Sequence, residues 1–236
     1  MLKRSLLALA LGTATLTAMS AHAVSVNNGD KLNITTPTLD GNGFVQPATG
    51  SWFGMDANGN GVINAGERIP LSQGTTGLVI GVTTLPGASH IGAPTAGDTN
   101  AIDAAWSFFG NTGSDFLSVA VTGSTTAGLD MTGWRVTWSG IPSINMGGGA
   151  WDAGFSDGIG NFVWDGVYGD PYTVDYHATV PIGDPSNFGG VKYALHLQGT
   201  VTAVPEASTY GMMLAGLSLV GLRLRRRAKG ERSIHA

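Results

Sequence analysis

Oxygen-bearing side chains recur at alternate positions just after Asp56 and return at Glu67. Asp56, Asn58 and Asn60 stand at positions 1, 3 and 5 of this twelve-residue stretch, and Glu67 stands at position 12. Gly61 at position 6 permits a sharp turn because it has no Cβ. Ca²⁺ is a hard cation that takes six to eight oxygen ligands, and this spacing can wrap oxygens around one point. The stretch therefore predicts a structural Ca²⁺ site.

Two further positions complete the ligand set. Val62 can offer its carbonyl at position 7, and Asn64 at position 9 can bind directly or through water. Over these twelve residues the chain resembles EF-hand and dockerin-type loops. Pro70 follows too closely for the usual exit helix, and only two carboxylates are present, so we expect weak binding, in the range of about 10⁻⁴ to 10⁻³ M. The alternative is a metal-free turn between two strands.

A second group of chemically active side chains falls on two strands near the end of the domain. If residues 172–180 and 191–197 form a hairpin, Asp175 lies opposite His196 on the outer face, with His177 two residues along. Such a trio could bind zinc or provide acid and base groups. The alternative is a solvated face with one cross-strand pair.

Six tryptophans raise the question of carbohydrate binding. Trp134 and Trp138 alternate with Val136, which favours a place in the core. Trp151 and Trp164 lie among glycines and aspartates, so they are the glycan candidates. The sequence has no G-x-S-x-G, H-E-x-x-H or G-x-x-x-x-G-K-[ST] motif, and we predict no catalytic residue.

Strands must position these residues. Period-two alternation or β-prone composition between turn residues marks seven stretches: 31–36, 77–84, 116–122, 133–139, 161–165, 172–180 and 191–201. Residues 99–109 could form a short helix or a loop, and the glycine-rich residues 146–160 predict a long loop. Strands without alternating helices predict an all-β ectodomain over 24–203, an antiparallel β-sandwich or jelly roll.

The charge of this domain differs from that of its flanks. Between Val24 and Val204 the sequence has four Lys and Arg against fourteen Asp and Glu, which gives −10, while the other eight basic residues lie near the two ends. An acidic domain argues against nucleic acid and anionic membrane surfaces as partners and is compatible with divalent cations. The absence of cysteine excludes disulfides, thiolate metal sites and a Cys nucleophile.

The first 23 residues have the three parts of a secretory signal peptide. Lys3 and Arg4 form a basic start, residues 5–16 are mostly apolar, and Ala21-His22-Ala23 is an A-x-A cleavage site. We therefore expect export by the Sec machinery and cleavage after Ala23. The alternative is a buried N-terminal helix.

The last thirty-odd residues have a similar three-part layout. Val204-Pro205-Glu206-Ala207 comes first, then an uncharged apolar run that predicts a helix over about 207–224, then a basic tail within 223–232. The run is near the lower limit for a membrane span, and its basic flank would hold the end in the cytoplasm. The alternative is an amphipathic helix on the membrane surface.

This tail, residues 204–228, resembles the PEP-CTERM sorting class of Gram-negative bacteria, although many members have a second proline where this chain has Ala207. The same type of tail is also labelled an ice-binding protein C-terminal domain, which describes the tail and not the cargo. The resemblance implies an exosortase, a membrane-embedded thiol transpeptidase or protease, that recognises Pro205-Glu206 and cleaves nearby. It also implies transient anchoring in the inner membrane, release to the surface or matrix, and an association with exopolysaccharide and biofilm systems.

These observations predict an exported structural protein of the cell surface or extracellular matrix, with a calcium-stabilised β domain and no enzymatic activity. A module that binds glycans or exopolysaccharide is the alternative. A secreted hydrolase and an ice-binding protein are weaker alternatives, because no catalytic motif is visible and the ice-binding label concerns the tail.

Overall fold

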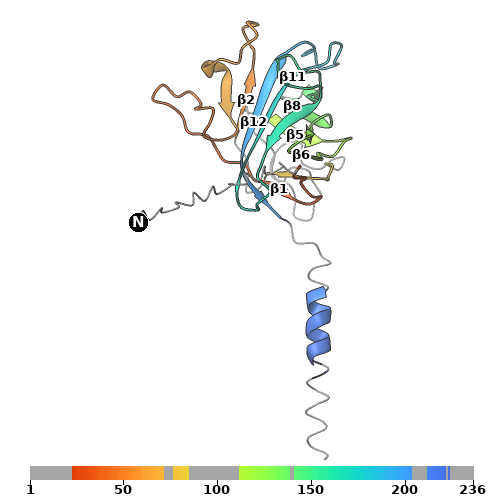
Figure 1. Cartoon of the computed structure of the whole chain (residues 1–236). Coiled ribbons are helices and arrows are strands. Elements are labelled where there is room, and N and C mark those ends of the chain that lie inside the picture. Colours follow the sequence, from red (N-terminus) through yellow and green to blue (C-terminus); the bar gives the residue numbers. More distant parts are fainter. Residues whose placement is uncertain are drawn as a thin grey trace, which may run out of the picture.

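The computed structural model describes residues 23–71, 77–84, 112–138, 141–203, 212–221 and 223 of the 236-residue chain. Two antiparallel sheets make up the domain before residue 203 (Figure 1). The larger sheet contains β1 (Lys31–Leu32), β2 (Trp52–Met55), β3 (Arg68–Pro70), β4 (Leu78–Val79), β6 (Gly123–Ser124), β7 (Gly128–Asp130), β10 (Ile159–Val163), β11 (Pro171–Thr179) and β12 (Lys192–Thr202). The smaller sheet contains β5 (Thr112–Phe116), β8 (Trp134–Trp138) and β9 (Ile141–Asn145).

The long strand β12 organises the larger sheet. The strand order is β3-β2-β12-β11-β10-β7-β6, and β1 pairs both with β12 and with β4. In the smaller sheet the order is β5-β8-β9. Side chains from both sheets share one apolar cluster, so the fold is the predicted antiparallel β-sandwich.

Aromatic rings fill the space between the two sheets. Trp134 of the smaller sheet is completely buried and meets Phe53, Tyr176 and Tyr193 of the larger sheet, with ring centroids 6.3, 6.3 and 5.8 Å away. Its indole N–H donates to the buried Ser114 hydroxyl, so its one polar group is satisfied. The prediction that Trp134 belongs to the core is confirmed.

The hairpin of β11 and β12 has the predicted register. Tyr176 pairs with Leu195, and Asp175 pairs with His196. Along β11, buried and half-buried side chains alternate from Tyr172 to Thr179, because one face meets the core and the other faces outward. The alternation in the sequence therefore predicted both the strand and its register correctly.

Six of the seven stretches with a strand pattern contain strands, and the stretch 116–122 is the exception. Its strand, β5, lies earlier and ends at Phe116. Phe116 and Val121 are fully buried, but the backbone between them bonds to loops: Leu117 N–H donates to Gly133 O and Gly81 N–H donates to Val121 O. The alternation in 116–122 arises because an irregular segment buries its apolar side chains, and it does not indicate a strand.

Other predictions concern the ends of the chain and one internal segment. Residues 1–22, which include most of the predicted signal peptide, lie outside the described residues, as do the predicted helix 99–109 and the processing residues 204–207. Part of the predicted C-terminal helix is described, over 212–221, and its apolar side chains are exposed (Figure 1). Within the described residues, no helix has both the length and the apolar character needed to cross a membrane.

Candidate functional site

The loop 56–67 connects two neighbouring strands of the larger sheet. It leaves β2 after Met55, ends in the short 3-10 helix η1 (Ala65–Glu67), and continues directly into β3. Strands β2 and β3 are paired, with Gly54 opposite Arg68, so the sheet holds both ends of the loop close together. As the position of Pro70 predicted, the residues after Glu67 form no exit helix.

Side-chain oxygens of the first half of the loop turn toward the loop's own backbone. The two carboxylate oxygens of Asp56 accept hydrogen bonds from the N–H groups of Asn60 and Gly61, at 3.0 and 2.9 Å. Asn58 Oδ1 also accepts from Asn60 N–H, and Asn60 Oδ1 accepts from Val62 N–H, both at 2.9 Å. These bonds curl the chain around the side chains at positions 1, 3 and 5.

Glu67 closes the loop from its other end. Its Oε1 accepts from the N–H groups of Ala57 and Asn58 at 3.0 and 3.2 Å, and its Oε2 accepts from Asn64 N–H at 2.9 Å. The backbone hydrogen bond from Asn64 is the largest influence on its pKa, and together with the bonds from Asn58 and Ala57 it lowers the pKa of the Glu67 carboxyl below its usual value. The carboxylate at position 12 is therefore bonded to the backbone at positions 2, 3 and 9 of the loop.

These residues fit a weak Ca²⁺ site. Gly59 and Gly61 have φ values of 72° and 80°, which only glycine adopts without strain, and they produce the tight wrap. Each oxygen that accepts one N–H keeps lone-pair capacity for a cation. Among the described residues, no group of three or more His, Cys, Asp or Glu could hold a metal, so any ion here would rely on amide and carbonyl oxygens besides two carboxylates.

The loop is fixed to the outer face of the sheet by Ile63 at position 8. This side chain is buried and packs with Val45, Trp52 and Ala194 in a small apolar cluster, separate from the main core. Gly54 of β2 makes room for it, since a Cβ at that glycine would lie 2.4 Å from Ile63 Cγ2. The loop geometry is therefore coupled to the sheet that it covers.

Beside this cluster, His196 is held by an aspartate and an indole ring. Its Nδ1 lies 2.6 Å from Asp175 Oδ1, across the predicted strand pair. Its ring stacks on Trp52 at 5.7 Å, and the Arg68 guanidinium lies 5.1 Å from the Trp52 ring centroid. The cross-strand Asp175–His196 pair is confirmed.

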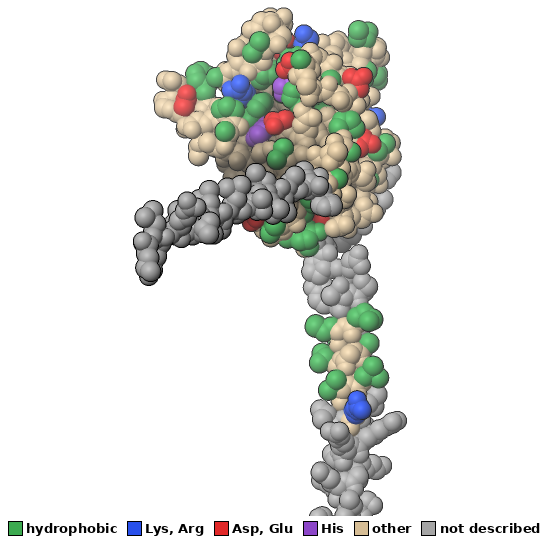
Figure 2. Space-filling view, viewed as in Figure 1, with side chains coloured by type: hydrophobic (Ala, Val, Ile, Leu, Met, Phe, Trp, Pro, Cys, Tyr) green, Lys and Arg blue, Asp and Glu red, His purple; other side chains and the backbone are tan. Residues whose placement is uncertain are grey.

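His177 belongs to a different pair on the same face. Its Nδ1 lies 3.2 Å from Asp152 Oδ2, and its ring stacks against Trp151 at 5.1 Å and Phe155 at 3.8 Å. Desolvation by these rings lowers the pKa of His177, although Asp152 opposes the shift. Figure 2 shows histidine beside acidic and hydrophobic side chains on this face. Each histidine therefore has its own aspartate, and among the described residues Asp175, His177 and His196 do not form a group that could hold a metal ion, so the zinc hypothesis is wrong.

The two predicted glycan candidates have different surroundings. Trp164 is 6% exposed, packs in the main core beside Phe162, and donates its indole N–H to Val167 O at 3.1 Å. Its ring therefore offers no face to a sugar, which corrects the prediction for this residue. Trp151 is half-buried on the outer face and donates to Tyr193 O at 2.9 Å.

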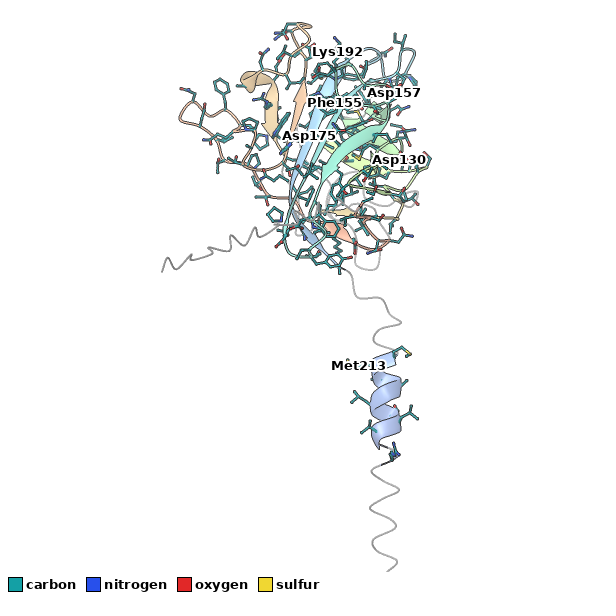
Figure 3. All side chains as sticks on the ribbon, in the orientation of Figure 1. Asp130, Phe155, Asp157, Asp175, Lys192 and Met213 are labelled. Carbon is teal, nitrogen blue, oxygen red and sulfur yellow. The ribbon has the colours of Figure 1, made fainter. Side chains whose placement is uncertain are left out.

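Several residues of this face were not predicted from the sequence. Asp152 and Phe155 lie in the glycine-rich loop, and Lys192, whose amine lies 5.5 Å from the Trp151 ring centroid, begins β12 (Figure 3). The outward alternation of β11 marked His177 as surface, but only the loop's path shows which rings stack on it. No local pattern in the sequence indicates that path.

The comparison with protein families concerns the tail. The chain carries a signal for export across the membrane and sorting by an exosortase: residues 203–227 match the PEP-CTERM protein-sorting motif. This match confirms the resemblance predicted for residues 204–228. Neither the curated proteins nor the solved structures include one that matches the chain.

Proposed function

We propose that this protein is a structural component of the cell surface or extracellular matrix, with a β-sandwich that is stabilised by Ca²⁺ in the loop 56–67. The observation that carries the proposal is the hydrogen-bond network within residues 56–67, in which the side chains at positions 1, 3, 5 and 12 all accept backbone N–H groups of the same loop. Calcium would pin a loop that joins two strands, in a domain that has no disulfide to do so.

The proposal includes a route to the surface. A signal peptide would be removed after Ala23, and the helix within 207–224 would anchor the chain in the inner membrane until an exosortase cleaves near Pro205-Glu206. Val24 supports this boundary, because it already belongs to the folded domain: its N–H donates to Thr125 Oγ1 at 3.1 Å, and its carbonyl accepts from Thr125 N–H at 2.9 Å. Mass spectrometry of the mature protein tests both ends, and a C-terminus that extends to Ala236 would contradict the processing.

Calcium binding can be measured by calorimetric titration and by thermal unfolding. With a Kd near 1 mM, 10 mM CaCl₂ should raise the melting temperature by about 3–5 °C, because a ligand present at ten times its Kd contributes about 1.4 kcal/mol. Magnesium should have a smaller effect, since it requires a rigid octahedral site.

The matched variants are Asp56→Asn and Asp40→Asn. Both aspartates accept two backbone N–H groups in exposed turns, but Asp40 lies outside the twelve-residue pattern. We expect Asp56→Asn to lose the Ca²⁺ response and Asp40→Asn to keep it. No heat and no melting shift at several times the millimolar range, or an equal response from both variants, would exclude the site.

Binding of exopolysaccharide is the second candidate, and the stacked rings around His177 favour it. Trp151 and Phe155 are half-buried on a face that also offers Asp152, Asp175 and Lys192 as polar partners. A pull-down with host exopolysaccharide tests this function: Phe155→Ala should weaken capture severalfold, while Phe44→Ala, which removes an exposed ring of another loop, should not. Equal capture by both variants would exclude this face.

A further inference from the structure

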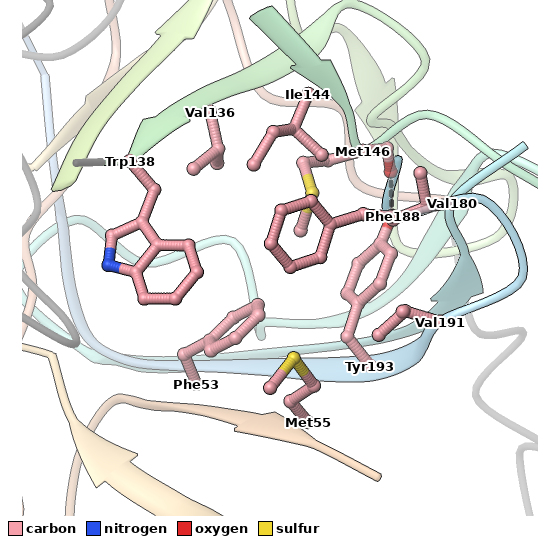
Figure 4. Close-up of a pocket in the computed structure, with 10 residues that line it drawn as sticks. All are labelled: Phe53, Met55, Val136, Trp138, Ile144, Met146, Val180, Phe188, Val191 and Tyr193. Atoms are coloured by element: carbon pink, nitrogen blue, oxygen red, sulfur yellow. Dashed lines mark hydrogen bonds between the residues drawn. The ribbon is translucent and has the colours of Figure 1, made fainter. Parts of the chain in front are cut away.

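An apolar cavity lies between the two sheets, whereas the calcium-type loop (residues 56–67) and the face with His177 and His196 lie outside them. Its volume is about 150 Å³. The lining residues come from both sheets and from the β11–β12 connection, and Figure 4 shows them: Phe53, Met55, Val136, Trp138, Ile144, Met146, Val180, Phe188, Val191 and Tyr193. Close-packed interiors have few spaces larger than one water molecule, so a cavity of this size is unusual.

Among the described residues, no polar atom lines this cavity. Tyr193 could have supplied one, but its hydroxyl donates to Met146 O and leaves only the ring for the cavity (Figure 4). Water in a cavity needs two to four polar partners, whereas an apolar cavity of similar size stays dry and accepts a benzene-sized molecule. The cavity therefore has the volume and chemistry for about one six-membered hydrocarbon ring.

Burial of the lining residues identifies the accessible end of the cavity. Val136, Ile144 and Val180 are buried at 2–5% exposure, whereas Trp138, Phe188 and Val191 are half-buried. Phe188 belongs to the connection between β11 and β12, and its ring meets Trp138 edge to face, with centroids 5.6 Å apart. These two rings form the entrance.

We propose that this cavity binds a single aromatic ring, either a small aromatic molecule or the aromatic end of a larger one. Four of the ten lining side chains are aromatic, and edge-to-face contacts with their rings favour an aromatic ligand. Met55 and Met146 add flexible, polarizable walls that can adapt to the ligand's outline. A polar substituent would have to point out past Trp138 and Phe188, because the described lining residues offer it no partner inside.

Toluene and phenol test the proposal, because they have the same shape and differ in one polar group. We would measure their binding to the full chain by calorimetry, with detergent micelles of fixed composition to account for partition. Toluene should bind saturably and raise the melting temperature by about 3–5 °C at ten times its Kd. Phenol should bind more weakly than toluene, because its hydroxyl has no partner among the lining residues and only the orientation with the hydroxyl at the entrance keeps it hydrated, whereas toluene can bind in any orientation. Equal binding of both, or no saturable toluene binding, would overturn the proposal.

Variants that fill the cavity add a second test. Val191→Phe places a ring at the entrance, while Ile34→Phe enlarges another half-buried side chain at the edge of the core that does not line the cavity. Val191→Phe should abolish toluene binding and Ile34→Phe should preserve it. If Val191→Phe does not fold, Val136→Met fills the cavity from its opposite wall. Toluene affinity that survives filling from either wall would overturn the proposal.

Discussion

The calcium-type loop and the apolar cavity are built in opposite ways. The loop gathers its oxygens from twelve consecutive residues and holds them by hydrogen bonds at the surface. The cavity gathers its walls from residues as far apart as Phe53 and Tyr193, and they meet only when the two sheets pack. Spacing along the chain can therefore reveal the loop, whereas the cavity exists only in the folded domain.

The difference also determines which region controls stability. Exposed hydrogen bonds contribute modestly, because water replaces them on unfolding. Removing a buried side chain from the cavity walls is costly, because the lost contacts and the added core space together cost about 2–5 kcal/mol. We therefore expect substitutions at the cavity to lower the free energy of unfolding more than substitutions in the loop.

The largest effect should come from Phe53→Ala, which enlarges the cavity. Phe53 is buried, stacks on Tyr193 at 5.9 Å and meets Trp134 edge to face. Urea denaturation should show a loss of about 3–5 kcal/mol in the free energy of unfolding. Phe44→Ala, at an exposed ring, should change it by less than about 0.5 kcal/mol. A loss below about 1 kcal/mol for Phe53→Ala would mean that packing around Phe53 contributes little to the free energy of unfolding.

Adding one methylene at Val136, which lines the cavity, and at Val174, which does not, should show whether the cavity has room for another group. Val136 faces the cavity, whereas Val174 is packed so closely that a Cβ at Gly160 would lie 2.9 Å from its Cγ1. Val136→Ile should be neutral or stabilise the fold by up to about 1 kcal/mol, and Val174→Ile should cost about 1–3 kcal/mol. Equal costs in urea denaturation would indicate that the side chains around Val136 already fill the space.

In the loop, Gly61→Ala should cost about 1–2 kcal/mol, because its φ of 80° is strained for any residue with a Cβ. Among the described residues, that Cβ would have Lys192 Nζ as its one neighbour within 4 Å, at 3.8 Å, so strain and not collision causes the loss. Gly41→Ala is the control, since its Cβ would meet nothing within 4 Å and its φ is not positive. Thermal unfolding without Ca²⁺ measures both, and equal stability would show that the loop does not adopt this turn.

The smallest effect should be a pH dependence that comes from Glu67. Its folded-state pKa lies below the ordinary 4.5, so the carboxylate's stabilising bonds are fully present above pH 4.5 and are lost as the pH falls through the lowered value. Glu67→Gln should therefore flatten the stability profile in that acidic window, in buffer with a calcium chelator. Profiles of identical slope for both proteins would show that Glu67 does not close the loop.

The sequence predicted best the elements whose information is local and repeated. The alternation in β11 and β12 was long enough to give the Asp175–His196 pair, because a shift of one residue would have exposed every apolar side chain. Twelve residues of fixed spacing likewise predicted the turn from Asp56 to Glu67, although occupation by Ca²⁺ remains a proposal.

Two of the strands that the sequence did not predict, β3 and β9, lie at sheet edges. β3 and β9 contain Pro70 and Pro142, which weaken a strand pattern because proline cannot donate a backbone hydrogen bond. Each of these strands stands at one end of its sheet, with a neighbour on one side, and there a missing backbone donor is tolerated. A strand's place in the sheet is a tertiary property, so the sequence alone did not indicate that these prolines are acceptable.

Trp164 shows the same limit for single side chains. Its neighbours along the chain are typical of a loop, yet the chain turns back and buries the ring beside Phe162 and Tyr168. The alternation of Phe162 and Trp164 in the predicted strand 161–165 does indicate a shared face, but the Gly and Asp neighbours, on which the glycan prediction for Trp164 rests, do not reveal that turn.

The position of β12 has a mechanical consequence. This strand leads directly to residue 203, where the sorting motif begins, and it is hydrogen-bonded to β11 along one side and to β2 and β1 along the other. Because hydrogen bonds between antiparallel strands run across the strand axis, a pull on the tail loads them together in shear. Pulling single molecules from the C-terminal end should thus require more force than pulling a hairpin apart from its loop, and equal forces would contradict this. The sorting motif therefore follows a strand that is paired on both of its sides.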